Sequence, residues 1–418
     1  MKICLVSAFP PSRRGLNEYG FHIARELQQD SLSSLIILAD QLDSGQDGQE
    51  LENFDVQRVW RFNSHFTPIR LLQAVQRFKP DVLWYNLLFS SFGDTPVAAF
   101  SGLTTPLLTR IAGCYTHITL HHLMDNINLE DANVRFPRLY RLAGNVATRL
   151  LLMANSVSVL LPAYRRTLIE KYRGENVHFR AHGIFSARPE YPDFTRRGNP
   201  EHRILAFGKW GTYKRLEQLI EAFFRLAPQM PQARLVIAGS DHPMAAGYVE
   251  SMARRYGDCA NMEFTGYVPE EKIPELFGTA SVLVMPYHSA TGASGVAHLA
   301  CQYGVPIISS DIPDFRSMAE DENLAINFCD LNRPQSMACE ILRLLRDPQL
   351  QREMAEQNFS AALRMTMPQV VRQYVRSFDL YQRSKALEPL SRFRRLPAWI
   401  PSRSSFFRAA SPGWQLWM

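Results

Sequence analysis

Short apolar runs alternate with longer amphipathic stretches along the first half of the chain. Short apolar runs bounded by turn residues are typical of buried strands, and apolar positions at helical spacing are typical of helices. The alternation predicts βαβ units that build a parallel sheet covered by helices. The expected elements are KICLVSA (2–8), LNEYGFHIARELQQ (16–29), LSSLIILA (32–39), DVLWYN (81–86) and HITLHH (117–122).

The same alternation returns after about residue 200 and predicts a second doubly wound unit. Between the two units, residues 187–203 are rich in proline, arginine and glycine, which favours an exposed connection with a domain boundary near 185–200. Three further helices are expected, at 335–347, 348–364 and 368–384. The repeated elements are RILAFG (203–208), YKRLEQLIEAFFRLA (213–227), ARLVIAG (233–239), SVLVMP (281–286) and VPIISS (305–310).

Composition places the chain among globular proteins of two or three domains. It has 418 residues, of which 46% are hydrophobic and 21% charged. The longest apolar region, 146–162, contains Arg149 and Asn155 and divides better into a helix and a strand than into a membrane span. The first residues are expected to form a buried strand rather than a secretory signal. The six cysteines show no metal-ligand spacing, which favours a reducing, cytoplasmic compartment.

The net charge of +6 belongs to the C-terminal end of the chain. From Arg383 onward there are seven basic residues and one acidic residue, whereas the rest of the chain has 39 of each. A neutral body argues against nucleic acid as a partner.

Three loops that follow expected strands carry glycine, lysine or serine where helices begin. Ligands of open parallel sheets bind outside the carboxyl ends of strands, where helix N-termini offer free amides to anions. Each loop alone fits an ordinary strand-to-helix connection, with structural glycines or solvated lysines, equally well. The loops are PPSRRGLNEYGFHIA (10–24), AFGKWGTYKRLEQLI (206–220) and TGASGVAHLACQYGVP (291–306).

In order and spacing, these loops and the segments between them resemble the glycosyltransferase family 4 group of GT-B enzymes. The resemblance covers roughly residues 1–385. In the first half it rests on PPSRRGLNEYGFHIARELQ, KPDVLWYN and ITLHHLMDN. In the second half it rests on FGKWGTYKRLEQLIEAF, RLVIAGS, MEFTGYVPEEKIPELFGTASVLVMPYHS, ACQYGVPIISSDIPDF and LNRPQSMACEILRLLRD.

The resemblance implies an α/β fold of the GT-B type, in which two Rossmann-like doubly wound domains face each other across a cleft. It implies an acceptor-side domain at 1–190, a nucleotide-sugar-binding domain at 191–365 and a helix at 366–385 that packs back on the N-terminal domain. Composition adds a fourth part, a basic aromatic tail at 386–418.

The family's cationic pair maps onto two lysines of the second loop. Lys209 stands where the family usually has arginine, and Lys214 matches its lysine. Both would neutralise the leaving diphosphate, because two cations beside a helix N-terminus act on the same oxygens. The donor-binding residues that the resemblance implies are Gly15, Gly208, Thr291, Gly292, Ser294, Gly295 and Val296.

The N-terminal half contributes a histidine and an acid to the expected site. His121 or His122 would face the donor sugar, and the sequence leaves open which of them does; a neutral histidine packed at a strand end is the alternative. Asp125 would meet an acceptor hydroxyl or cap a helix. Gly15 matches the second glycine of the family's N-terminal loop, and Arg14 occupies the first.

The chain departs from the family in the third loop. The family commonly has two glutamates there, eight positions apart, that meet the transferred sugar and the ribose. Thr291 and Leu299 stand at those positions, and neither offers a carboxylate. His298 would replace the second glutamate after a shift of one position, or it packs on a helix face.

The resemblance implies a retaining glycosyltransferase that moves a hexosyl group from a nucleotide diphosphate sugar to a glycan or lipid-linked acceptor in cell-surface polysaccharide synthesis. No metal or other cofactor is expected, because lysines and helix amides would absorb the developing charge. The alternatives are a non-catalytic GT-B partner subunit and a GT-B enzyme with a different reaction.

The basic aromatic tail leaves two interpretations open. In one, its arginines face anionic headgroups at the inner face of the membrane while its aromatic side chains enter the interface. In the other, the tail has no role or folds against the body. The residues in question are Arg392, Phe393, Arg394, Arg395, Trp399, Phe406, Phe407, Trp414 and Trp417.

Overall fold

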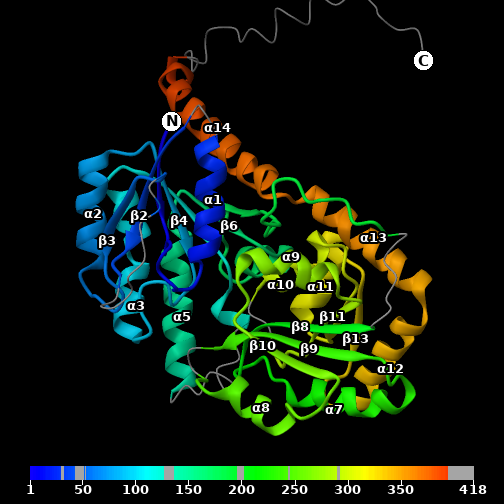
Figure 1. Cartoon of the computed structure of the whole chain (residues 1–418). Coiled ribbons are helices and arrows are strands. Elements are labelled where there is room, and N and C mark those ends of the chain that lie inside the picture. Colours follow the sequence, from blue (N-terminus) through cyan, green and yellow to red (C-terminus); the bar gives the residue numbers. More distant parts are fainter. Residues whose placement is uncertain are drawn as a thin grey trace, which may run out of the picture. The chain divides into compact units, whose positions relative to one another are not determined.

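The chain folds around two parallel sheets, each flanked by helices (Figure 1). Residues Met1–Val371 form one compact unit that contains both sheets, and Arg372–Met418 form a second. The computed structural model describes residues 1–29, 33–42, 51, 53–126, 136–194, 202–242, 245–289 and 292–393.

The first sheet has seven strands in the order β3-β2-β1-β4-β5-β6-β7, and every neighbouring pair is parallel. Its central strands are buried almost completely, as expected of a sheet covered on both faces. The elements are β1 (Lys2–Val6), α1 (Asn17–Gln29), β2 (Ser34–Asp40), β3 (Val56–Trp60), α2 (Thr67–Phe78), β4 (Val82–Leu87), α3 (Pro96–Leu103), α4 (Thr105–Ile111), β5 (Tyr115–Leu120), η1 (Met124–Asn126), α5 (Pro137–Leu152), β6 (Ser156–Val159), α6 (Pro162–Glu170) and β7 (Val177–Phe179).

The second sheet has six parallel strands in the order β10-β9-β8-β11-β12-β13. The elements are β8 (Arg203–Trp210), α7 (Glu217–Leu226), η2 (Ala227–Gln229), β9 (Arg234–Asp241), α8 (Tyr248–Tyr256), β10 (Met262–Gly266), η3 (Glu270–Lys272), α9 (Ile273–Gly278), β11 (Val282–Met285), α10 (Gly295–Gln302), β12 (Ile307–Ser310), α11 (Pro313–Glu322), β13 (Ile326–Cys329), α12 (Pro334–Arg346), α13 (Pro348–Arg364) and α14 (Met367–Phe393).

The two doubly wound units expected from the sequence are therefore confirmed. The apolar region 146–162 is a helix followed by a strand, α5 and β6. No described helix combines the length and the hydropathy needed to cross a membrane. The tail from Arg394 onward lies outside the described residues, and the packing expected of residues 366–385 stays a prediction.

The described part of the connection between the sheets, up to Phe194, makes contacts that its composition does not suggest. Ile184 pairs in parallel with Thr366, so the chain returns beside the connection before α14 begins. Phe194 was expected in an exposed segment, yet it is buried in a small cluster with Ala355 and Phe359 of α13. An apolar side chain inside a polar stretch anchors the connection here.

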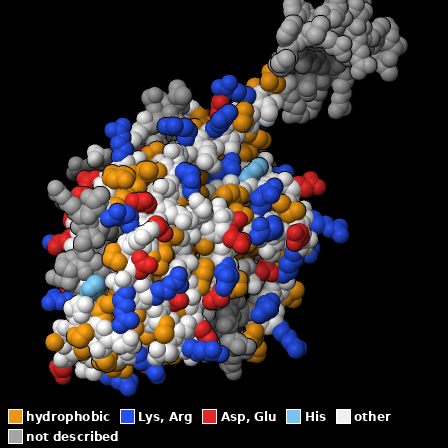
Figure 2. Space-filling view, turned by 90° about the vertical axis from the view of Figure 1, so that its right-hand side faces the viewer, with side chains coloured by type: hydrophobic (Ala, Val, Ile, Leu, Met, Phe, Trp, Pro, Cys, Tyr) orange, Lys and Arg blue, Asp and Glu red, His pale blue; other side chains and the backbone are white. Residues whose placement is uncertain are grey.

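The surface carries both signs of charge. On the face shown in Figure 2, basic and acidic side chains are interspersed. This mixture fits a body whose net charge is near zero.

Candidate functional site

The loops after β1 and β8 lie where the strand order of each sheet reverses. β1 has β2 on one side and β4 on the other, and β8 has β9 and β11 in the same way. At such switch points, neighbouring connections leave toward opposite faces of the sheet and open a crevice for ligands. The first two loops singled out in the sequence therefore lie where this topology predicts binding.

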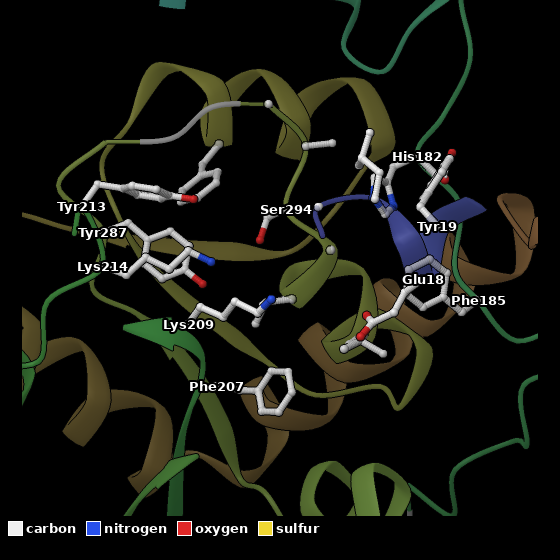
Figure 3. Close-up of a pocket in the computed structure, with 18 of the residues that line it drawn as sticks. Glu18, Tyr19, His182, Phe185, Phe207, Lys209, Tyr213, Lys214, Tyr287 and Ser294 are labelled. Carbon is white, nitrogen blue, oxygen red and sulfur yellow. Dashed lines mark hydrogen bonds between the residues drawn. The ribbon is translucent and has the colours of Figure 1, made fainter. Parts of the chain in front are cut away.

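A pocket of about 330 Å³ brings the three loops together (Figure 3). Its volume is within the range of small-molecule sites. Residues from the first sheet's half and the connection form one side, and residues from the second sheet's half form the other. The lining residues are Gly15, Leu16, Asn17, Glu18, Tyr19, His182, Phe185, Phe207, Lys209, Tyr213, Lys214, Tyr287, Gly292, Ala293, Ser294, Gly295, Val296, Leu299 and Phe315.

Two cations line the pocket, one from the end of β8 and one from the loop that follows it. Lys209 is exposed, whereas Lys214 is half-buried and its Nζ lies 4.4 Å from the centre of the Tyr287 ring. Desolvation, together with the nearby charge of Lys209, lowers the pKa of Lys214 to about 8. The pair therefore repels itself until an anion arrives, which suits a site for a doubly charged ligand.

Tyr287 adds a polar group that the sequence did not point to. It follows β11, is 2% exposed, and its hydroxyl has no hydrogen-bond partner among the described residues. A buried hydroxyl without a partner is costly unless a ligand or water completes it. Its position after Pro286 at a strand end was the available signal.

The start of α10 is a capped helix N-terminus. The Ser294 hydroxyl accepts a hydrogen bond from the amide of Ala297 at 3.3 Å and donates to the sulfur of Met285. It therefore acts as the helix cap. The amides of Gly295 and Val296 belong to the first turn, where helix amides have no intrahelical partner, and both residues line the pocket.

Gly292 lines the pocket and also allows a close backbone contact. Its φ is +105°, and a Cβ built there would lie 2.3 Å from the carbonyl oxygen of His121. Its amide donates to Oδ2 of Asp314 at 3.3 Å. The glycine thus lets this loop contact the backbone of the first sheet's half, which differs from the expected close approach to a ligand.

His121 and His122 do not line this pocket. His121 Nε2 lies 2.6 Å from Oδ1 of Asn86, and its ring packs edge-on against Tyr19. Burial, followed by the neighbouring His182 and His122, keeps the pKa of His121 well below its ordinary value. His122 packs against Phe89. Both histidines thus lie in packed surroundings at the strand end.

The histidine that reaches the pocket is His182, in the connection after β7. Its Nδ1 lies 2.9 Å from the carbonyl oxygen of Gly183, and its carbonyl accepts a hydrogen bond from Tyr19 Oη. Burial and the neighbouring His298 lower the pKa of His182 to about 3, so the ring is neutral. The sequence signal was the pair His182–Gly183, three residues past the end of β7, and the φ of Gly183 is positive in the structure.

The structure also places one carboxylate in the pocket, and it comes from a segment in which the sequence predicted no acid of the site. Glu18, in the first turn of α1, lines the pocket on the side opposite Lys209 and Lys214 (Figure 3). The acid therefore comes from the first sheet's half and not from the third loop. Sequence reasoning used this segment only for Gly15, which does line the pocket.

Arg14, at the position of the family's first glycine, is restrained by contacts of its side chain. Its Nε lies 3.5 Å from Oδ2 of the buried Asp40, and its guanidinium lies 3.9 Å from the centre of the Phe62 ring. The loop that lacks one glycine is thus fixed by side-chain contacts.

Asp125 does not line the pocket. Its carboxylate pairs with Lys171 and accepts a hydrogen bond from Tyr172 Oη at 2.8 Å. These contacts occupy it within the first sheet's half and differ from the expected contact with an acceptor.

Gly208, expected at the donor site, lies on β8 and is not among the residues that line the pocket. A Cβ built on it would lie 3.6 Å from Lys214 Nζ and 3.8 Å from Tyr287 Oη, so it adjoins two residues that do line the pocket. A Cβ built at Gly239 of β9, whose φ is +113°, would meet the Gly208 carbonyl oxygen at 1.9 Å, so Gly239 serves the close approach of the two strands.

His298 does not substitute for a family glutamate. It is 2% exposed, and its Nε2 lies 2.9 Å from Oε2 of the equally buried Glu322. Burial lowers the pKa of His298, but the charge of Glu322 and hydrogen bonds to Glu322 and Ser294 outweigh this effect. The pKa of His298 is therefore raised above its ordinary value. The ring faces away into packing, while its neighbour Leu299 gives the pocket an apolar surface. Thr291 lies outside the described residues.

Within the described part of the chain, no three His, Cys, Asp or Glu side chains are grouped as ligands of a metal ion would be. The expectation of a metal-independent reaction stays a prediction.

Comparison with known proteins also points to glycosyltransferases. Residues 188–360 match the family model "Glycosyl transferases group 1". Over 154 residues, 37% of this chain, the sequence is 29% identical to the alpha-D-kanosaminyltransferase of Streptomyces kanamyceticus. The matched part spans 39% of the length of each curated relative.

Two solved structures share the fold over most of the chain. Sucrose-phosphate synthase from Thermosynechococcus elongatus superposes with a TM-score of 0.71 at 16% identity, covering 93% of this chain and 100% of that one. HepE of Anabaena, in complex with UDP and glucose, superposes with a TM-score of 0.65 at 18% identity, covering 91% of this chain and 99% of that one. Together with the two parallel sheets, this likeness confirms the GT-B fold.

The family match includes both lysines, Tyr287 and the start of α10. The resemblance inferred from the sequence is thus confirmed, and it is residues 188–360 that match the model of the glycosyl transferases group 1 family.

Proposed function

We propose that the protein transfers a sugar from a nucleoside diphosphate sugar bound in this pocket. The observation that carries the proposal is the meeting of Lys209, Lys214 and the first-turn amides of α10 in one cavity. Cations and helix amides at one point form a site for a diphosphate. The related fold of HepE is known with UDP, which makes uridine nucleotides the first to test.

The same groups would assist departure of the nucleoside diphosphate. Negative charge grows on the leaving oxygens as the glycosidic bond breaks, and fixed cations stabilise the transition state more than the ground state. Tyr287 Oη, which has no partner among the described residues, would donate a further hydrogen bond. The lysines would thus do what a divalent cation does in metal-dependent enzymes, and the reaction would need no metal.

Glu18 is the acid that we propose for the sugar. The two family glutamates of the third loop are replaced by Thr291 and Leu299, and Glu18 is a carboxylate that lines the pocket from α1. It would accept hydrogen bonds from sugar hydroxyls on the side away from the lysines. Leu299 would meet an apolar edge of the donor where a carboxylate usually lies.

The finer identity of the reaction follows the family resemblance. We propose retention of anomeric configuration, a hexosyl group, and a glycan or lipid-linked acceptor of cell-surface polysaccharide synthesis at the cytoplasmic side of the membrane. The basic aromatic tail would contribute a peripheral membrane contact.

A non-catalytic partner subunit is the second candidate, and the apolar Leu299 at a glutamate position is what favours it. Such a subunit would bind nucleotide without turnover, whereas an enzyme retains Lys214 for the transition state.

Purified protein would be incubated with UDP-, GDP-, ADP- and TDP-sugars, with and without EDTA, and release of nucleoside diphosphate would be measured. The proposal predicts release with one nucleotide class, unchanged by EDTA, and a product whose anomeric configuration by NMR equals that of the donor. Binding without release from any donor or added acceptor supports the non-catalytic subunit. Loss of release in EDTA, restored by Mg²⁺, contradicts metal independence.

A further inference from the structure

Helix α5 presents large apolar side chains to solvent. Exposed fractions reach 62% for Leu139, 60% for Leu142, 42% for Val146 and 47% for Met153, which follows the helix directly. The side that packs on the body buries Gly144, Ala147, Thr148 and one large apolar residue, Leu151. A helix normally turns its large apolar residues toward the core, so the exposure of Leu139, Leu142 and Val146 departs from this pattern.

The exposed residues form one continuous stripe. Leu139, Val146 and Met153 are separated by seven residues each, which is nearly two turns, and Leu142 lies between the first two on the same side. The stripe runs for about 20 Å along the helix at a rise of about 1.5 Å per residue. Phe136, immediately before α5, extends it with 59% exposure.

The neighbouring helix continues the apolar surface. Arg110 of α4 donates hydrogen bonds to the carbonyl oxygens of Met153 and Ala154, which fixes the end of α4 beside the end of α5. Ile111, the last residue of α4, is 72% exposed. Large apolar side chains that are exposed side by side are a mark of interaction surfaces. The residues of this α5 face are Ile111, Phe136, Leu139, Leu142, Val146 and Met153.

The charged side chains that α4 and α5 themselves carry have one sign. Helices α4 and α5 contain no aspartate or glutamate. Arg138, Arg141 and Arg149 are exposed on α5, and helical spacing puts Arg138 and Arg149 along one border of the stripe. Arginines that flank exposed leucine and phenylalanine, with no acid between them, match an anionic lipid surface, because the guanidinium groups reach headgroups while the apolar side chains enter the interface.

We propose that the α5 face docks the protein on an anionic lipid surface. The site is distinct from the C-terminal tail, and the inference does not rest on the proposed sugar transfer. Lipid is favoured over a protein partner because exposed arginines on helices without an acidic residue complement a negatively charged bilayer. Docking through α5 would leave η1, which carries Asn126 and precedes α5 in the chain, close to the bound surface.

Full-length protein would be sedimented with vesicles of phosphatidylcholine alone or mixed with phosphatidylglycerol. Wild type is expected to bind the anionic vesicles, and binding should weaken as NaCl is raised. Leu139→Ser/Leu142→Ser should lower the partition coefficient at least about tenfold. Arg138→Gln/Arg149→Gln should lower it about tenfold on anionic vesicles, where each arginine interacts with the surface charge.

Matched controls lie far along the chain. Leu363→Ser removes an apolar side chain of 44% exposure from α13, and Arg352→Gln removes an exposed charge from the same helix; both should bind as wild type does. A tail variant, Arg392→Gln/Arg394→Gln/Arg395→Gln, measures the other proposed contact. Melting temperature and circular dichroism check that each variant is folded.

The inference is overturned if the two α5 variants are folded and bind anionic vesicles as wild type does, whether or not the tail variant loses binding. The inference is also overturned if the wild-type protein does not bind anionic vesicles. Self-association that the α5 variants abolish, with no vesicle binding, would identify a protein interface instead.

Discussion

Tyr164 donates a hydrogen bond of 2.7 Å to Oδ2 of Asp314, and so joins α6 of the first sheet's half to α11 of the second. Asn126 donates to Oδ1 of the same carboxylate at 3.1 Å, and the Gly292 amide donates to Oδ2. Burial and the charge of Asp314 raise the pKa of Tyr164, which remains a hydrogen-bond donor. One buried carboxylate thus ties both halves to the third loop of the pocket.

Tyr164→Phe should weaken this connection. A buried carboxylate that loses a donor costs about 1–3 kcal/mol, and the free energy of unfolding should fall by that amount. Nucleotide affinity should fall as well, because the Gly292 loop loses part of its support. Thermal denaturation and calorimetry measure the two effects. Tyr191→Phe, at a side chain that is 75% exposed, is the control, and equal behaviour of the two variants would refute the prediction.

Gly292→Ala should destabilise the protein more than Gly247→Ala does. Both glycines have positive φ, so both variants carry backbone strain of about 1–2 kcal/mol. A Cβ at Gly247 meets open space, whereas one at Gly292 would meet the His121 carbonyl oxygen at 2.3 Å. Melting temperatures compare them directly. If the two variants lose the same stability, the close approach has no energetic weight.

Nucleoside diphosphate affinity should fall as the pH rises through about 8, which is the pKa of Lys214. The free protein keeps this pKa low through burial and Lys209, and a bound diphosphate would raise it. Binding therefore takes up a proton above about pH 8, and affinity should drop by up to tenfold per pH unit there. Calorimetry in buffers of different ionisation enthalpy counts the proton. Lys214→Met should abolish this uptake, and its persistence would assign the proton to another group.

Glu18→Gln should separate sugar handling from nucleotide binding. Loss of a charged acceptor for a sugar hydroxyl should reduce kcat/KM for the nucleotide sugar about tenfold or more. The affinity for the nucleoside diphosphate alone should stay within about twofold, because no carboxylate on this side contacts the phosphates. Glu250→Gln, in the exposed first turn of α8, is the matched control. Wild-type turnover in Glu18→Gln would remove this residue from the site.

The sheets were predictable because their central strands are short apolar runs. β1 lies within a segment singled out from the sequence, β4 and β8 extend such segments by one and two residues, and the alternation with helices sets their parallel order. β3 was missed because it is an edge strand, with polar side chains in VQRVW and partial burial. Periodicity reports burial, and an edge strand has little of it.

The site residues were predictable only where they lie together in one strand-to-helix loop. Lys209, Lys214 and the start of α10 lie at strand ends, where local sequence and topology suffice. Glu18, His182 and Tyr287 reach the pocket because segments distant in sequence converge, and no spacing records that convergence. His121 has the right position in the chain, but its contact with Asn86 turns its ring elsewhere.

The central claim is that Lys209, Lys214 and α10 bind a nucleoside diphosphate. Thermal unfolding of wild type and Lys214→Met would be measured against UDP, GDP, ADP and TDP, with Lys272→Met, an exposed lysine, as control. The account predicts that one nucleotide at about 100 times its dissociation constant stabilises wild type and Lys272→Met by about 2.7 kcal/mol, and Lys214→Met far less. No stabilisation by any nucleotide, or equal stabilisation of all three proteins, would contradict it.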